Sequence, residues 1–198
     1  MSPANPGRRM RPVLAASLAG LALLAAAPAS AQLALELRGG AGAGSYGATG
    51  AGFQFVPQPA GSAALSYAFR PGVAAYAGYT YARFGCEREG FCIGAEPVFT
   101  SQGLDAGVRL DLPPGLWVRG GLVLHSLNGE SSAGDESTDA ALGFGVGAGF
   151  GVPLGSRLTL TPGVGYTRHG APGPAGDHAV AFVTADLGLR FSLSGPRR

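Results

Sequence analysis

Charged residues are spaced two or four positions apart inside otherwise apolar segments of this chain. Glu36 and Arg38 form one such pair, and Asp105 and Arg109 share a face of another segment. Charges that a protein encloses persist when they are paired and hydrogen-bonded. These residues could therefore neutralise one another in an ionic network that fills an interior. The predicted network consists of Glu36, Arg38, Asp105, Arg109, Arg119, Asp186 and Arg190.

Such residues must be carried by β-strands that have two unlike faces. Residues 139–152, DAALGFGVGAGFGV, place apolar residues at even positions and glycine at the odd positions from 143 to 151. Strict period-two alternation marks a strand, whereas a helix would lose stability at each glycine. Alternation of this kind predicts eight strands, at 33–44, 62–69, 73–84, 98–112, 116–127, 139–152, 157–169 and 178–193.

The connections between these strands alternate in length. Short turns are predicted at 70–72, 113–115 and 153–156, and long loops at 45–60, 85–97, 128–138 and 170–177. Long loops at one end and tight turns at the other are typical of a bacterial outer-membrane barrel. The predicted fold is all-β, an eight-stranded antiparallel up-and-down transmembrane β-barrel.

This topology predicts which charges meet. The tight turn at 113–115 places Arg109 opposite Arg119, and like charges in that position destabilise a sheet. Both arginines therefore need carboxylates, and Asp105, Asp186 or Glu36 could supply them. The first and last strands must adjoin to close the barrel, which brings the Glu36 and Arg38 pair near the Asp186 and Arg190 pair.

The glycine face indicates whether the outside of the barrel contacts water or lipid. In a soluble, lipocalin-like barrel the apolar face points inward, and the alternate glycines would leave bare backbone in water. In a membrane barrel the faces are reversed, so the glycines make room inside for Trp117, Phe182 and the arginines. We therefore expect the apolar rows to contact lipid.

The N-terminus predicts export. Arg8, Arg9 and Arg11 precede an apolar run that ends in Ala29-Ser30-Ala31, as in a secretory signal peptide. The predicted organisation is a signal peptide at 1–31, a barrel at 32–193 and a short tail at 194–198. Of the 14 basic residues, three leave with the signal, so 11 remain against 12 acidic residues, a formal charge of about −1. Nothing in this balance favours nucleic acid.

The chain resembles the small eight-stranded outer-membrane barrels, the family that includes OmpX and the transmembrane domain of OmpA. The resemblance covers residues 32–193 and rests on architecture. It implies an outer-membrane location and insertion by the barrel-assembly machinery, which reads an aromatic residue near the C-terminus, here Phe191. The enclosed charges are expected to form a structural plug of the lumen, and the resemblance implies as an alternative an ionic gate that rearranges.

Two groups of residues outside the lumen are candidate sites, one for a disulfide and one for lipid contact. Cys86 and Cys92 lie close together in an exported chain, which favours a disulfide over a metal site. Arg83, Arg88 and Arg168 are expected near the outer rim, where they could meet lipopolysaccharide phosphates. We predict no cofactor and no metal site.

The predicted function is non-enzymatic: a structural or surface-interaction protein that acts through its exposed loops. Eight strands enclose only enough space for side chains, so general porin activity is not expected. One alternative is a lipid A-modifying enzyme, because some barrels that resemble this one acylate or deacylate lipid A. The deacylases' His-x-Ser arrangement is missing, since His125 and Ser126 are adjacent and point to opposite faces. The other alternative is a soluble periplasmic ligand-binding barrel.

Overall fold

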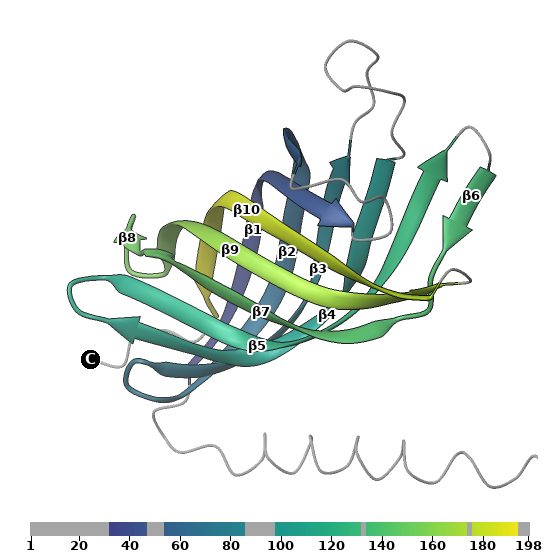
Figure 1. The fold of residues 1–198 in the computed structure, drawn as a ribbon. Helices are drawn as coiled ribbons and strands as arrows, with labels where there is room; N and C mark the ends of the chain where they lie inside the picture. Colours follow the sequence, from purple (N-terminus) through teal and green to yellow (C-terminus); the bar gives the residue numbers. More distant parts are fainter. Residues whose placement is uncertain (1–31, 47–53, 86–97, 132–133, 174–175, 194–198) are drawn as a thin grey trace, which may run out of the picture.

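The computed structural model describes residues 32–46, 54–85, 98–131, 134–173 and 176–193. The described residues form strands and short connections (Figure 1). The eight long strands are β1 (Gln32–Tyr46), β2 (Gln54–Arg70), β3 (Val73–Gly85), β4 (Val98–Leu112), β5 (Leu116–Ser131), β7 (Ala141–Phe150), β9 (Leu158–Gly173) and β10 (Gly176–Ser192). Two short strands, β6 (Gly134–Ser137) and β8 (Val152–Pro153), pair with β5 and β9. No helix in this part of the chain is long and apolar enough to cross a bilayer.

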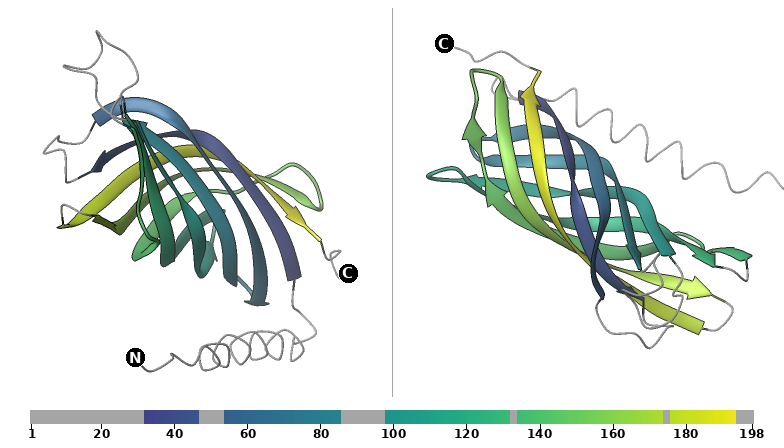
Figure 2. Two further views of the ribbon diagram at one scale, coloured as in Figure 1. Left: turned by 90° about the vertical axis from the view of Figure 1, so that its right-hand side faces the viewer. Right: turned by 90° about the horizontal axis from the view of Figure 1, so that it is seen from above.

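The long strands close into a barrel. Each pairs antiparallel with the next long strand in the chain, and β10 pairs with β1, where Glu36 lies opposite Arg190. Figure 2 shows the tilted strands wrapping around one axis, with β1 and β10 side by side. The predicted eight-stranded antiparallel barrel is confirmed. Closure pairs each of the eight long strands on both sides, which a lipid environment requires because it offers no hydrogen-bond partners.

The two ends of the barrel differ. At what we call the turn end, Pro71 and Gly72 join β2 to β3, residues 113–115 join β4 to β5, and residues 151–157 with β8 join β7 to β9. Gly72 and Gly115 have φ angles of 72° and 116° in these turns, a conformation that favours glycine. The opposite end, the loop end, carries the β1–β2, β3–β4, β5–β6 and β9–β10 connections.

The predicted long loops are partly wrong, because several strands continue toward the loop end. Residues from Gln54 to Ala60 belong to β2 and pair with β1 across a register shift. β5 continues to Ser131 and forms a hairpin with β6, and β9 and β10 stay paired out to Gly173 and Gly176. Hydrogen bonds between backbones do not need alternating side chains. Glycine, proline and polar residues therefore ended the sequence pattern without ending the strand.

Side-chain exposure confirms the predicted assignment of faces. The outward rows are exposed, with Leu104 62% exposed, Leu122 60% and Leu142 66%, whereas Arg38 and Arg109 are buried. A soluble barrel requires the reverse arrangement, with apolar side chains inside and charged ones in water. The interpretation of the chain as a soluble ligand-binding barrel is therefore wrong.

The glycine row of β7 faces inward and makes room for large side chains, as predicted. A Cβ atom on Gly149 would lie 2.6 Å from Cζ2 of Trp117, and one on Gly147 would lie 3.2 Å from Nε of Arg119. A third glycine, Gly44 on β1, leaves similar room for Phe182, whose Cβ would lie 3.0 Å away. The glycines on one side of the lumen thus leave room for the large side chains on the other side.

Candidate functional site

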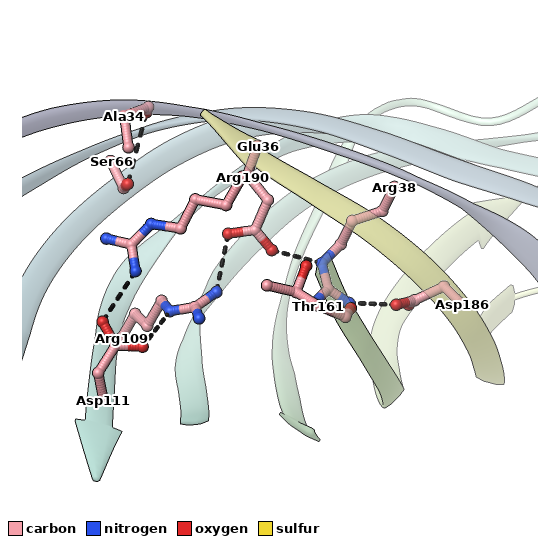
Figure 3. A network of polar contacts seen from close by, with 9 residues as sticks. All are labelled: Ala34, Glu36, Arg38, Ser66, Arg109, Asp111, Thr161, Asp186 and Arg190. Atoms are coloured by element: carbon pink, nitrogen blue, oxygen red, sulfur yellow. Dashed lines mark hydrogen bonds and ion pairs between the residues drawn. The ribbon is translucent and has the colours of Figure 1, made fainter. Parts of the chain in front are cut away.

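An ionic layer crosses the lumen near the turn end (Figure 3). Glu36 is its centre and accepts hydrogen bonds from Nε of Arg38 at 2.5 Å and from Nη1 of Arg109 at 2.8 Å. Arg38 also forms an ion pair with Asp186 and donates to the carbonyl oxygen of Thr161 at 3.1 Å. Strands β1, β4, β9 and β10 are thereby tied together across the interior.

The layer continues toward the turns through a carboxylate that the predicted network did not include. Asp111 accepts from Nε of Arg109 at 2.8 Å and from Nη1 of Arg190 at 2.9 Å. Arg190 therefore pairs with Asp111. Glu36 and Asp186, the carboxylates that were expected near Arg190, form ion pairs with Arg38 instead. Asp111 follows Arg109 by two residues in β4 and so shares its inward face, and from the end of the strand it contacts both Arg109 and Arg190.

Trp117 completes this layer, and the guanidinium groups of two arginines lie over its ring. The guanidinium carbon of Arg38 lies 4.3 Å from the Trp117 ring centroid, and that of Arg109 lies 4.8 Å away. The indole is 1% exposed. Arginine stacks well on an aromatic face, and the attraction strengthens when water is excluded. An aromatic ring and six charged side chains thus fill the cross-section.

Two of the predicted network residues stand apart from the ionic layer. Arg109 and Arg119 are Cα partners across the turn, as predicted. Arg119 makes no ion pair among the described residues, and its guanidinium lies 5.8 Å from the Tyr76 ring centroid. Asp105 also pairs with no arginine in the described part of the chain, and accepts hydrogen bonds from Thr80 and His125 instead.

A small cavity separates Arg119 from Asp105. Its volume is about 40 Å³, which accommodates a few water molecules. Polar groups line much of it, including Arg38, Tyr76, Thr167, Thr184 and Asp186. A cavity of this size holds water and excludes any larger solute.

Beyond the cavity, two histidines and a serine form a second polar cluster. Nε2 of His125 lies 2.7 Å from Oδ1 of Asp105, and its Nδ1 lies 3.2 Å from Oγ of Ser101. The same Oγ lies 2.8 Å from Nε2 of His169. This cluster was not predicted from the sequence. The register across the 113–115 turn places His125 opposite Gly103, between Ser101 and Asp105, and that signal was available.

An apolar layer closes the lumen at the loop end. Phe84, Leu127, Val180 and Phe182 are each at most 2% exposed and pack together with Ala82 and Ala171. The Phe84 and Phe182 rings stack with centroids 6.2 Å apart, and Phe182 also stacks on His125 at 6.4 Å. The lumen is thus filled by charged side chains near the turn end and by apolar side chains near the loop end.

The remaining predicted site residues lie at the loop end. Arg83 on β3 and Arg168 on β9 belong to outward-facing rows near that end. Arg88, Cys86 and Cys92 lie outside the described residues, as do the predicted signal peptide at 1–31 and the predicted C-terminal tail at 194–198. Among the described residues, no group of three His, Cys, Asp or Glu side chains is arranged to hold a metal ion.

The Asp105–His125–Ser101 order superficially matches a nucleophilic triad. In such a triad Nδ1 of the histidine faces the carboxylate and Nε2 faces the serine. Here the two nitrogens are exchanged, and Ser101 is 0% exposed with its hydroxyl held between two imidazoles. The cluster has no surface for a substrate carbonyl, so it carries no acyl-transfer chemistry in this arrangement.

Comparison with solved structures finds the same fold. Neisserial surface protein A (NspA) is 14% identical with a TM-score of 0.66, over 83% of this chain and 99% of that one. Ail, the attachment invasion locus protein of Yersinia pestis, solved with the heparin analogue sucrose octasulfate, is 15% identical with a TM-score of 0.51, over 81% of this chain and 99% of that one. No curated protein matches the chain. The family model of the outer membrane protein beta-barrel domain matches residues 16–191, and the chain belongs to this family.

Proposed function

We propose that this protein is a non-enzymatic outer-membrane barrel that acts through its outer surface and loop end and conducts no general solute flow. The observation that carries the proposal is the double closure of the lumen, by the Glu36 ionic layer and by the Phe84 and Phe182 apolar layer. A solute that enters from either end meets packed side chains. Interaction with other molecules is therefore left to the exterior.

Electrical recording tests the closed lumen. We expect the purified monomer in a planar bilayer to show no large, steady conductance, because the cavity between the two layers has a volume of only about 40 Å³. A general porin reconstituted in the same bilayer verifies that the assay detects open channels. Large steady openings from the monomer would overturn this part of the proposal.

The exterior of the loop end suits lipopolysaccharide. Arg168 is exposed on an outward-facing row of β9, beside Phe144 of β7. Lipopolysaccharide phosphates lie at the level of the membrane surface, and arginine binds phosphate through parallel hydrogen bonds. The loop end faces the cell exterior if short turns face the periplasm, as is general for outer-membrane barrels. We place Arg83 on β3 and Arg88 in the same role.

Replacement of Arg168 by glutamine is expected to weaken lipopolysaccharide retention. An exposed ion pair contributes at most about 1 kcal/mol, so retained lipopolysaccharide should fall roughly two- to fivefold. The measurement is the molar ratio of lipopolysaccharide to barrel after mild detergent extraction. Arg157→Gln is the matched control, because Arg157 is exposed at the turn end, away from the outer leaflet. Equal ratios for both variants and wild type would refute the contact.

The names of the similar structures agree with a surface role. NspA is a surface protein by name, and Ail is an attachment invasion protein that was solved with a heparin analogue. At 14% and 15% identity these likenesses extend to the fold, so the surface role of this chain rests on its own closed lumen. The enzymatic alternative finds no support in the buried Ser101 cluster.

A further inference from the structure

The side chains between the water cavity and the apolar layer form one continuous hydrogen-bonded chain. It runs from Asp105 on β4 to His125 on β5, back to Ser101 on β4, and on to His169 on β9, whose Nδ1 lies 2.7 Å from the carbonyl oxygen of Gly170. Ser101 and His125 are 0% exposed and His169 is 2% exposed. Water therefore supplies no alternative partner to these three residues.

The hydrogen atoms in this chain can be counted. The carbonyl oxygen of Gly170 only accepts, so Nδ1 of His169 carries a hydrogen and Nε2 of a neutral His169 must accept. An ionised Asp105 also only accepts, so Nε2 of His125 carries a hydrogen and Nδ1 of a neutral His125 must accept. Two accepting nitrogens then face Ser101, whose hydroxyl has a single hydrogen. Four hydrogen bonds share three hydrogens.

One additional proton completes the chain. With His125 as an imidazolium, Nε2 donates to Asp105 and Nδ1 donates to Ser101, whose hydroxyl donates to His169, which donates to Gly170. Every link then has one donor and one acceptor, and the positive charge lies directly beside the Asp105 carboxylate. A buried polar group without a partner is costly, and the adjacent Asp105 carboxylate offsets the cost of burying the imidazolium, so the complete chain is the favoured state.

We propose that Asp105, His125, Ser101 and His169 form a buried site that binds one proton as a unit. The bound proton links β4, β5 and β9 directly beneath the apolar layer. Gly143 of β7 leaves room for His169 of β9, because a Cβ atom at position 143 would lie 2.6 Å from Cβ of His169. Release of the proton leaves one of the four links without a hydrogen.

Polar, charged and aromatic groups from β1, β3, β5 and β10 surround the site. On β3, Thr80 donates a hydrogen bond to the second oxygen of Asp105, and Phe182 of β10 stacks on the His125 ring. The cavity beside Asp105 is lined by Tyr76 of β3, Arg38 of β1, Arg119 of β5 and Asp186 of β10. Arg38 and Asp186 already pair with each other, so Asp105 is the carboxylate that faces both the bound proton and the Arg119 guanidinium across the cavity.

Nitrogen NMR of the histidine rings tests the proposal on the folded barrel in detergent micelles. The chain has 3 histidines, and a His178→Gln variant leaves the two of the site. An ordinary histidine is half-protonated near pH 6.5. At pH 7.5 we expect three of the four remaining ring nitrogens to carry hydrogen, with the shifts of one imidazolium and one neutral ring.

Asp105→Asn separates proton binding from simple packing, because the amide oxygen still accepts from His125 but carries no charge. The midpoint of proton release should fall by roughly one to three pH units, or 10- to 1,000-fold in proton affinity. Two neutral rings in the wild-type barrel at pH 7.5 would overturn the proposal without any variant. So would an unchanged midpoint in Asp105→Asn. Stoichiometric uptake of Zn²⁺ at pH 7 would also overturn it, since a metal ion would then occupy the position of the proton.

Discussion

Glu36→Gln is expected to destabilise the barrel by about 3 kcal/mol. Glu36 is 5% exposed and neutralises both Arg38 and Arg109, which are themselves buried. Removal of one partner from a buried ion pair typically costs about 3–5 kcal/mol, because an uncompensated charge is left behind. Each arginine keeps a second carboxylate, Asp186 or Asp111, so the lower end of that range applies.

Denaturant unfolding of the barrel in micelles, followed by the heat-modifiable shift on gels, measures this loss. Asp111→Asn is the matched control: it removes a carboxylate from the same network, but the Asp111 side chain is 37% exposed. Water then screens what remains, and the loss should stay near or below about 1 kcal/mol. Equal losses in the two variants would show that the ionic layer is solvated and closes nothing.

Leu122→Arg is expected to cost about 2–4 kcal/mol although Leu122 is 60% exposed. Leu122 faces outward near the middle of β5, between Ala106 and Phe144 on its neighbours. A charge at the bilayer midplane must be dehydrated or must draw water and headgroups inward. On a water-soluble barrel the same exposed substitution would change stability by no more than about 0.5 kcal/mol.

Equilibrium folding into lipid vesicles under denaturant gives the free energy that this prediction needs. Leu154→Arg serves as control, since Leu154 is 56% exposed but lies in the turn-end segment between β8 and β9. Close to the interface an arginine costs about 0–1 kcal/mol. A depth-independent result, with both variants alike, would mean that the apolar rows do not face hydrocarbon.

Local alternation was enough to predict most of the barrel wall. The side chain that follows an outward one must point inward, so the lumen positions of Glu36, Arg109 and Trp117 followed from their neighbours alone. Short turns fix register in the same local way, and the pairing of Arg109 with Arg119 across residues 113–115 was predictable for that reason. The length of the strands toward the loop end was not predictable from the sequence, because backbone pairing there continues without an apolar pattern.

The sequence by itself determined which residues are enclosed, because the two-residue period of a strand separates its faces without reference to the rest of the chain. The tertiary structure alone decided which enclosed residues meet across the lumen, on strands that are not neighbours. Strand tilt and closure set the relative heights of side chains on strands that are not neighbours. That geometry stacks Arg38 on Trp117 and pairs Arg190 with Asp111. It also brings His169 of β9 within hydrogen-bonding distance of the Ser101 hydroxyl.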